Sequence, residues 1–131
     1  MPAVDTNVLV RWLIDDDPVQ TAHAQKLFDA ARTSQSLFVP ITVTLELEWV
    51  LRSRYLFEKT TVLATYNSLL DTHELEFQDE AAIEHALHRY RSGAAEFADC
   101  LHAGLGAVAQ RMPLLTFDAK AARLSGVQRV G

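Results

Sequence analysis

Short apolar segments alternate with longer amphipathic ones along the whole chain, and this alternation limits the possible folds more than any other feature. Each short segment, such as 36–40 or 113–116, has the length and composition of a buried strand. Each longer segment repeats apolar residues at helical spacing. Strands joined through helices pair in parallel by right-handed crossovers. The sequence therefore predicts an α/β fold, a three-layer α/β/α domain whose short, mostly parallel sheet is flanked by helices.

The expected elements follow one another without a linker or repeat. The predicted strands are 3–5, 36–40, 75–77, 113–116 and 126–130. The predicted helices are 8–14, 18–32, 42–56, 58–70, 80–93, 95–110 and a short one after residue 118. Residues 15–17, three aspartates, are expected to form a solvated turn. A chain of 131 residues with 49% hydrophobic composition can bury one core, so a single domain over 1–131 is predicted.

The charge balance argues against a surface that attracts nucleic acid by itself. Seventeen acidic residues against twelve Lys and Arg give a formal charge of −5, so no domain-wide positive field is expected. An excess of carboxylates can instead hold a cation, which then meets the phosphate. The positions of the acids therefore carry more information than their number.

Several features indicate a cytoplasmic protein. No apolar run approaches the roughly 18 residues of a membrane helix. The first residues contain neither the basic nor the apolar region of a secretory signal. Cys100 is the single cysteine, so no internal disulfide can form. We expect a reducing compartment and no membrane association.

Two aspartates, Asp5 and Asp118, directly follow predicted strands. Ligand sites of parallel α/β sheets lie at the carboxyl ends of strands, which makes both residues candidates for a site. Each could equally cap the helix that follows it, because Asp accepts hydrogen bonds from the free N–H groups of a first turn. Asp5 stands out because two short polar side chains, Thr6 and Asn7, follow it and can orient its carboxylate.

Two glutamates interrupt the apolar segment 42–51, and at about 100° per residue they point roughly 200° apart. Glu48 is expected to form an exposed helix pair with Arg52, four residues on. Glu46 has Val43, Trp49 and Val50 at three or four residues along the helix, and a buried carboxylate without a partner is costly. It is predicted to be a metal ligand, the alternative being a core acid satisfied by backbone groups.

Asp99 is a similar anomaly, because the helix around it is otherwise apolar. Its alternative role is to interact with the N-terminus of that helix. Four such acids in one small domain repel one another, and a divalent ion would make the cluster tolerable at neutral pH. Oxygen ligands favour Mg²⁺ or Mn²⁺ over Zn²⁺. We therefore expect Asp5, Glu46, Asp99 and Asp118 to converge on one cleft.

At these positions the sequence resembles the PIN domains, and among them the VapC-type toxins of bacterial toxin–antitoxin pairs. The resemblance covers nearly the whole chain and depends on the order and separation of four motifs. They are Val-Asp-Thr-Asn-Val-Leu at 4–9, Leu-Glu-Leu-Glu-Trp-Val-Leu at 45–51, Phe-Ala-Asp-Cys-Leu-His-Ala at 97–103 and Leu-Thr-Phe-Asp at 115–118.

The resemblance implies a Mg²⁺-dependent endoribonuclease, with Mn²⁺ as a possible substitute, that hydrolyses RNA phosphodiester bonds with metal-activated water. It places the catalytic and metal-binding acids at Asp5, Glu46, Asp99 and Asp118, and supporting roles at Thr6, Asn7 and Thr116. It also implies a homodimer and a cognate antitoxin that places a basic side chain beside Asp5 and Asp99. The candidate cations for RNA binding are Arg11, Arg52, Arg54, Lys59, Lys120 and Arg123.

Three other classes are weighed against this interpretation. A receiver-like phosphoacceptor domain would need an acidic pair at the end of the first strand, where only Asp5 stands. A haloacid-dehalogenase phosphatase would need an aspartate at position 7, which is Asn7. A protein-interaction module would leave the acids within apolar helices unexplained. Within the nuclease class, a housekeeping RNA-processing enzyme remains the alternative to a toxin.

Overall fold

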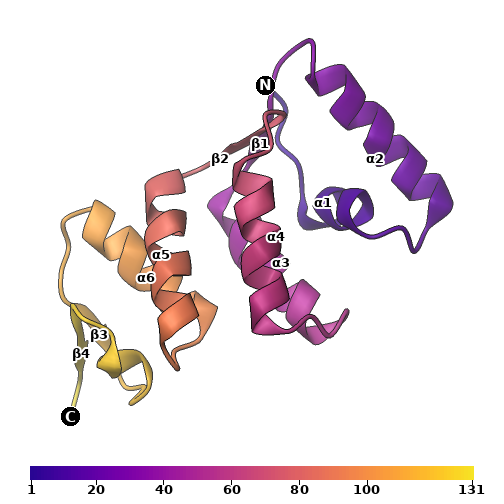
Figure 1. Cartoon of the computed structure of the whole chain (residues 1–131). Helices are drawn as coiled ribbons and strands as arrows, with labels where there is room; N and C mark the ends of the chain where they lie inside the picture. Colours follow the sequence, from indigo (N-terminus) through magenta and orange to yellow (C-terminus); the bar gives the residue numbers. More distant parts are fainter. The chain divides into compact units, whose positions relative to one another are not determined.

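The computed structural model describes residues 1–131, in which α-helices alternate with short strands along the chain (Figure 1). The chain gathers into two compact units, Met1–Gln78 and Asp79–Gly131. No helix has both the length and the apolar character that crossing a membrane requires. The single domain expected over 1–131 stays a prediction.

The first unit contains four helices and one pair of strands. In chain order they are α1 (Thr6–Leu13), α2 (Pro18–Ala31), β1 (Leu37–Val39), α3 (Ile41–Ser53), α4 (Lys59–Leu70) and β2 (Leu75–Phe77). The two strands pair in parallel, with Leu37 opposite Leu75. Helix α3 packs against both α1 and α4, so it lies at the centre of the unit.

The core of this unit explains why α3 and α4 form where they do. Helix α3 buries Thr44, Leu47, Glu48 and Leu51, a set at helical spacing, so this face belongs to the core. Helix α4 buries Val62, Leu63, Tyr66 and Leu69 on one face. The Tyr66 hydroxyl donates a hydrogen bond to the backbone carbonyl of Thr44, which satisfies a buried polar group and joins the two helices.

The second unit consists of α5 (Glu80–Ser92), α6 (Phe97–Val108), β3 (Leu114–Thr116), the 3-10 turn η1 (Ala121–Arg123) and β4 (Val127–Arg129). Strands β3 and β4 pair in parallel. Helices α5 and α6 pack closely because Gly104 has no side chain: a Cβ there would lie 2.7 Å from the Ala82 carbonyl oxygen. At the other end of the pair, the Tyr90 and Phe97 rings meet edge to face with centroids 5.4 Å apart.

The observed elements confirm the predicted alternation, and every strand pairing is parallel. Two elements differ from their predicted extent by more than two residues. The strand expected at 3–5 is reduced to a single parallel bridge between Ala3 and Phe38, since Pro2 has no N–H with which to extend the ladder. The helix expected over 42–56 ends at Ser53, and Leu56 beyond it adopts a left-handed backbone with φ 58°.

Candidate functional site

The four predicted carboxylates are held as two pairs, one in each unit. Asp5 and Glu46 belong to the first unit, and Asp99 and Asp118 belong to the second. The convergence of all four on one cleft stays a prediction. Each pair is described separately below, beginning with the polar contacts that orient it.

Asp5 is the N-cap of α1. One of its carboxylate oxygens, Oδ1, accepts a hydrogen bond of 3.2 Å from the Val8 backbone N–H. The capping role that the sequence left open is thus realised. The side chain is exposed, and its second oxygen, Oδ2, has no hydrogen-bond partner within the protein. Asp5 can therefore cap the helix and still offer one oxygen to a ligand.

Glu46 is oriented by the residue that follows Asp5. The hydroxyl of Thr6, a buried residue at the start of α1, donates a short hydrogen bond to Glu46 Oε1. This contact ties the first turn of α1 to the middle of α3, forty residues away. It brings Glu46 to the same pocket as Asp5 and leaves its second oxygen available.

The expected burial of the two glutamates is the reverse of the observed one. Glu46 is exposed, whereas Glu48 is only 3% exposed and lies on the core face of α3. The predicted Glu48–Arg52 pair is present, with Nε and Oε2 2.8 Å apart, but its carboxylate is buried. The interpretation of Glu46 failed on burial because Trp49, which was counted as a core neighbour, points to solvent.

An open pocket of about 200 Å³ contains both carboxylates of the first unit. We call it the carboxylate pocket. It is lined by Asp5, Thr6, Asn7, Glu46, Trp49, Val50 and Arg54. Its donor atoms are carboxylate, hydroxyl and amide oxygens, which are the ligand types that Mg²⁺ and Mn²⁺ prefer. The residues present therefore fit a hard divalent cation.

In the second unit, Asp99 lies in the first turn of α6 and is partly exposed. Partial burial raises the pKa of Asp99 above its ordinary value, the negative charges of Asp118 and Glu96 raise it further, and His102 opposes them. Two like charges share one neighbourhood, so the ionised pair is under strain that a cation would relieve.

Asp118 follows β3 in the loop that leads into η1. Its Oδ1 accepts hydrogen bonds from the backbone N–H groups of Lys120, at 2.7 Å, and Ala121, at 3.2 Å. Its own backbone N–H donates to the Thr116 hydroxyl at 3.0 Å. Asp118 thus accepts from backbone N–H groups at the start of η1, close to its alternative role as a cap, although the N-cap residue is Lys120. Thr116 fixes the loop that carries Asp118.

Within neither unit do three or more His, Cys, Asp or Glu side chains gather as metal ligands. Each unit supplies two carboxylates, each with an oxygen left over from structural hydrogen bonds. A site with four carboxylate ligands therefore stays a prediction. The carboxylate oxygens of each pair are suitable ligands for a hard divalent cation.

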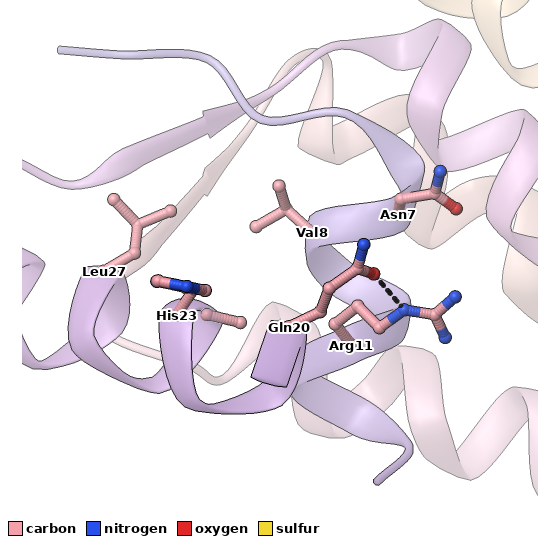
Figure 2. Close-up of a pocket in the computed structure, with 7 residues that line it drawn as sticks. Asn7, Val8, Arg11, Gln20, His23 and Leu27 are labelled. Atoms are coloured by element: carbon pink, nitrogen blue, oxygen red, sulfur yellow. Dashed lines mark hydrogen bonds between the residues drawn. The ribbon is translucent and has the colours of Figure 1, made fainter. Parts of the chain in front are cut away.

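A second pocket of about 280 Å³ lies between α1 and α2, and Asn7 lines both this pocket and the carboxylate pocket (Figure 2). Figure 2 shows side chains from both helices on its walls, with Arg11 Nε donating to Gln20 Oε1 at 2.6 Å. The pocket walls combine the polar residues Asn7, Arg11, Gln20 and His23 with the apolar residues Val8, Ala24 and Leu27.

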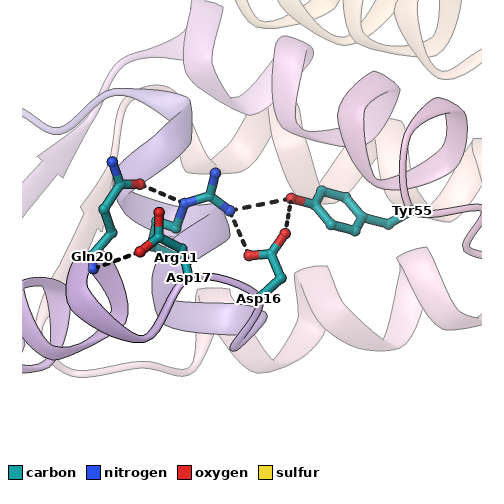
Figure 3. Close-up of polar contacts among 5 residues, drawn as sticks. All are labelled: Arg11, Asp16, Asp17, Gln20 and Tyr55. Carbon is teal, nitrogen blue, oxygen red and sulfur yellow. Dashed lines mark hydrogen bonds and ion pairs between the residues drawn. The ribbon is translucent and has the colours of Figure 1, made fainter.

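Arg11, one of the candidate RNA contacts, connects α1 to Asp16 and Tyr55 (Figure 3). It pairs with Asp16 at 2.6 Å, and the Tyr55 hydroxyl donates to the other oxygen of Asp16 at 2.9 Å. The hydrogen bond with Tyr55 and the charge of Asp16 raise the pKa of Arg11, although burial opposes them. Asp17 caps α2 through the Gln20 N–H. The acidic turn at 15–17 is therefore structural, not merely solvated as expected.

The remaining candidate cations differ in their availability. Arg52 is paired with the buried Glu48, whereas Arg54 lines the carboxylate pocket. Sequence reasoning named Trp49 only as an apolar neighbour of Glu46 and missed its place in this pocket. Its position three residues after Glu46 on a helix was the available signal, since residues at that spacing share a face.

Comparison with known protein families matched residues 3–127 of the chain to the PIN domain. The matched range contains all four carboxylates and both supporting threonines. It also confirms the predicted α/β fold class with short parallel strands. A search among curated proteins found no match.

Proposed function

The chain belongs to the PIN-domain family, whose members are generally metal-dependent nucleases, and from this premise we propose that it is a Mg²⁺-dependent endoribonuclease acting as a toxin. The supporting observation is the shared position of Asp5 and Glu46. They line one open pocket, and each keeps an oxygen free of structural hydrogen bonds. Oriented, accessible carboxylates can hold a divalent cation of the kind that supports hydrolysis.

The proposed site residues are Asp5, Glu46, Asp99 and Asp118, with Thr6, Asn7 and Thr116 in support. Bound by these carboxylates, Mg²⁺ would polarise the phosphodiester and make water more acidic. The chain's own contribution is orientation. Thr6 holds Glu46, the start of α1 holds Asp5, and Thr116 holds the loop of Asp118. A free oxygen of Glu46 or Asp118 is then available to accept a proton from the attacking water.

The raised pKa of Asp99 supports its inclusion in this set. Groups whose pKa is shifted by burial and by a specific charged neighbour cluster at functional sites. Here the neighbour is Asp118, another member of the proposed set. A cation bound near Asp99 and Asp118 would offset the repulsion between their carboxylates.

Cleavage of a labelled RNA by the purified chain tests this proposal. We expect products with Mg²⁺, none with excess chelator, and none from Asp5→Asn or Asp99→Asn. The matched control is Glu76→Gln, which removes an exposed carboxylate from β2 that is not among the proposed site residues. Equal activity in the Asp5, Asp99 and Glu76 variants would contradict the proposed catalytic role of Asp5 and Asp99.

The proposed toxin role needs a partner. We propose a cytoplasmic homodimer that an antitoxin silences by placing an arginine against Asp5, because guanidinium and carboxylate groups pair strongly. Induced expression in bacteria should arrest growth, and expression of Asp5→Asn should not. Light scattering at micromolar concentration should give the mass of two chains, and a mass of one chain would contradict the dimer.

A further inference from the structure

Trp49 is exposed beside the proposed catalytic carboxylates. Its residue is 51% exposed, although it lies in the middle of α3, a helix whose opposite face forms the core. Trp49 lines the carboxylate pocket together with Asp5 and Glu46. The exposed ring leaves apolar surface in contact with water, and folding gains no free energy from that surface. A ligand that covers the ring would gain the free energy of burying it.

The other tryptophan in the same unit, Trp12, packs its ring against another aromatic side chain. Trp12 stacks on the buried Phe28, with centroids 4.1 Å apart and planes within 3° of each other. No aromatic ring of the protein stacks on Trp49. Its flat face is therefore available for the type of contact that Trp12 makes internally.

Arg54 provides a positive charge in the same pocket. The other arginines of this unit are engaged: Arg11 with Asp16, Arg32 with Asp29, and Arg52 with Glu48. The Arg54 guanidinium has no ion pair or hydrogen bond within the protein, and the residue is exposed at the end of α3. Guanidinium groups suit phosphate oxygens in geometry and charge.

The composition of the pocket distinguishes between possible occupants. Five of its seven lining residues are polar or charged, whereas the cores of protein interfaces are depleted in charge. A nucleotide combines a flat aromatic base with a charged phosphate, which matches a tryptophan and an arginine set among polar groups.

We propose that Trp49 stacks on a nucleobase of the RNA substrate and that Arg54 contacts an adjoining phosphate. The two side chains would thereby position one nucleotide beside Asp5 and Glu46. This inference rests on the proposed nuclease function, and it adds positioning residues for the substrate. An unpaired base is required, because a base within a duplex has no free face.

Intrinsic fluorescence can report on each tryptophan separately. Trp12→Phe leaves Trp49 as the only emitter, and Trp49→Phe leaves Trp12. Both changes are made together with Asp99→Asn, so that the RNA stays intact in Mg²⁺. With a short single-stranded RNA of mixed sequence, we expect saturable quenching of Trp49 and unchanged emission from Trp12. The same RNA annealed into a duplex should leave both signals unchanged.

Affinity and kinetics provide the second measurement. Trp49→Ala should weaken binding of a labelled single strand roughly 5- to 100-fold, the usual range for loss of one stacked base. Trp49→Phe should retain most of the affinity, because a flat ring remains. In cleavage assays, Trp49→Ala should raise KM more than it lowers kcat, as expected for a residue that positions RNA.

The outcomes separate this inference from the nuclease proposal. Cleavage by the wild type without quenching of Trp49 would overturn the stacking and leave the nuclease proposal intact. Saturable quenching without cleavage by the wild type would support the stacking and overturn the nuclease proposal. Trp49 emission that changes with protein concentration in the absence of RNA would assign this ring to a contact between two copies, and would also overturn the stacking.

Discussion

The hydroxyl of Thr6 donates a hydrogen bond to the carboxylate of Glu46, and this contact aligns two helices that are separated along the chain. Thr6 is itself buried behind the cap that Asp5 provides. The orientation of Glu46 therefore depends on a residue that is not expected to touch RNA.

Replacing Thr6 with Val should lower Mg²⁺-dependent cleavage by about 10- to 100-fold, the usual effect of losing a group that orients a metal-binding residue. Valine has nearly the shape of threonine, and Glu46 is exposed enough to be hydrated, so the melting temperature should change little. The control is Thr6→Ser, which keeps the hydroxyl and should keep most of the activity. Equal activity in the valine and serine variants would remove the orienting role.

Asp99→Asn should abolish cleavage and raise the melting temperature at pH 7. The pKa of Asp99 is above its ordinary value of 3.8 in the folded protein, so the folded state binds the proton more tightly than the unfolded chain. Stability is thus lost as pH rises through the folded-state pKa, and the variant avoids that loss. The difference should vanish below pH 3.8, where both states are protonated.

The control for Asp99 is Glu84→Gln, which removes an exposed acid from α5. Mg²⁺ should also raise the melting temperature of the wild type more than that of Asp99→Asn, because bound cation stabilises the folded state. A lower melting temperature for Asp99→Asn at pH 7 would contradict the repulsion described for this pair.

Gly104→Ala should destabilise the second unit by about 1–3 kcal/mol, the usual cost of overpacking. The new Cβ would lie 2.7 Å from the Ala82 carbonyl oxygen, which the backbone of α5 cannot easily move away. Gly106→Ala on the same helix is the control, since its Cβ would lie 3.3 Å from the nearest atom. Urea unfolding that ranks the two variants in the opposite order would refute the close packing of α5 and α6.

His85 should make stability depend on pH. Its Nδ1 is buried without a hydrogen-bond partner, and burial, then Arg89 and His88, lower its pKa below 6.5. As pH falls through 6.5, the unfolded chain takes up the proton more readily than the folded protein, so stability is lost on acidification. Between about pH 7.5 and pH 5.5, the wild type should lose more stability than His85→Leu. Parallel losses in urea unfolding would exclude His85 as the cause.

Much of the fold could be predicted because local patterns fix it. The 2.0 and 3.6 residue periods locate strands and helices, and most boundaries agree within a few residues. The boundary at Ser53 could not be predicted, since it depends on Leu56 adopting a backbone conformation that its side chain disfavours.

The candidate site was less accessible to prediction than the fold. The assignment of Glu46 over Glu48 agrees with its place beside Asp5, but the reason given, burial, was wrong. Which face of α3 enters the core depends on α1 and α4, and a single amphipathic segment does not specify that partner. For the same reason, the exposure of Trp49 could not be read from its hydrophobic character.

The two carboxylate oxygens of Asp5 have different roles: Oδ1 caps α1, and Oδ2 has no hydrogen-bond partner within the protein. Alanine at this position would remove both, and loss of the cap alone would cost about 0.5–2 kcal/mol. Asparagine keeps an oxygen for the Val8 N–H while it removes the charge. A well-folded, inactive version of this chain is therefore better made with asparagine than with alanine at position 5, since the same carboxylate caps α1 and is the proposed metal ligand.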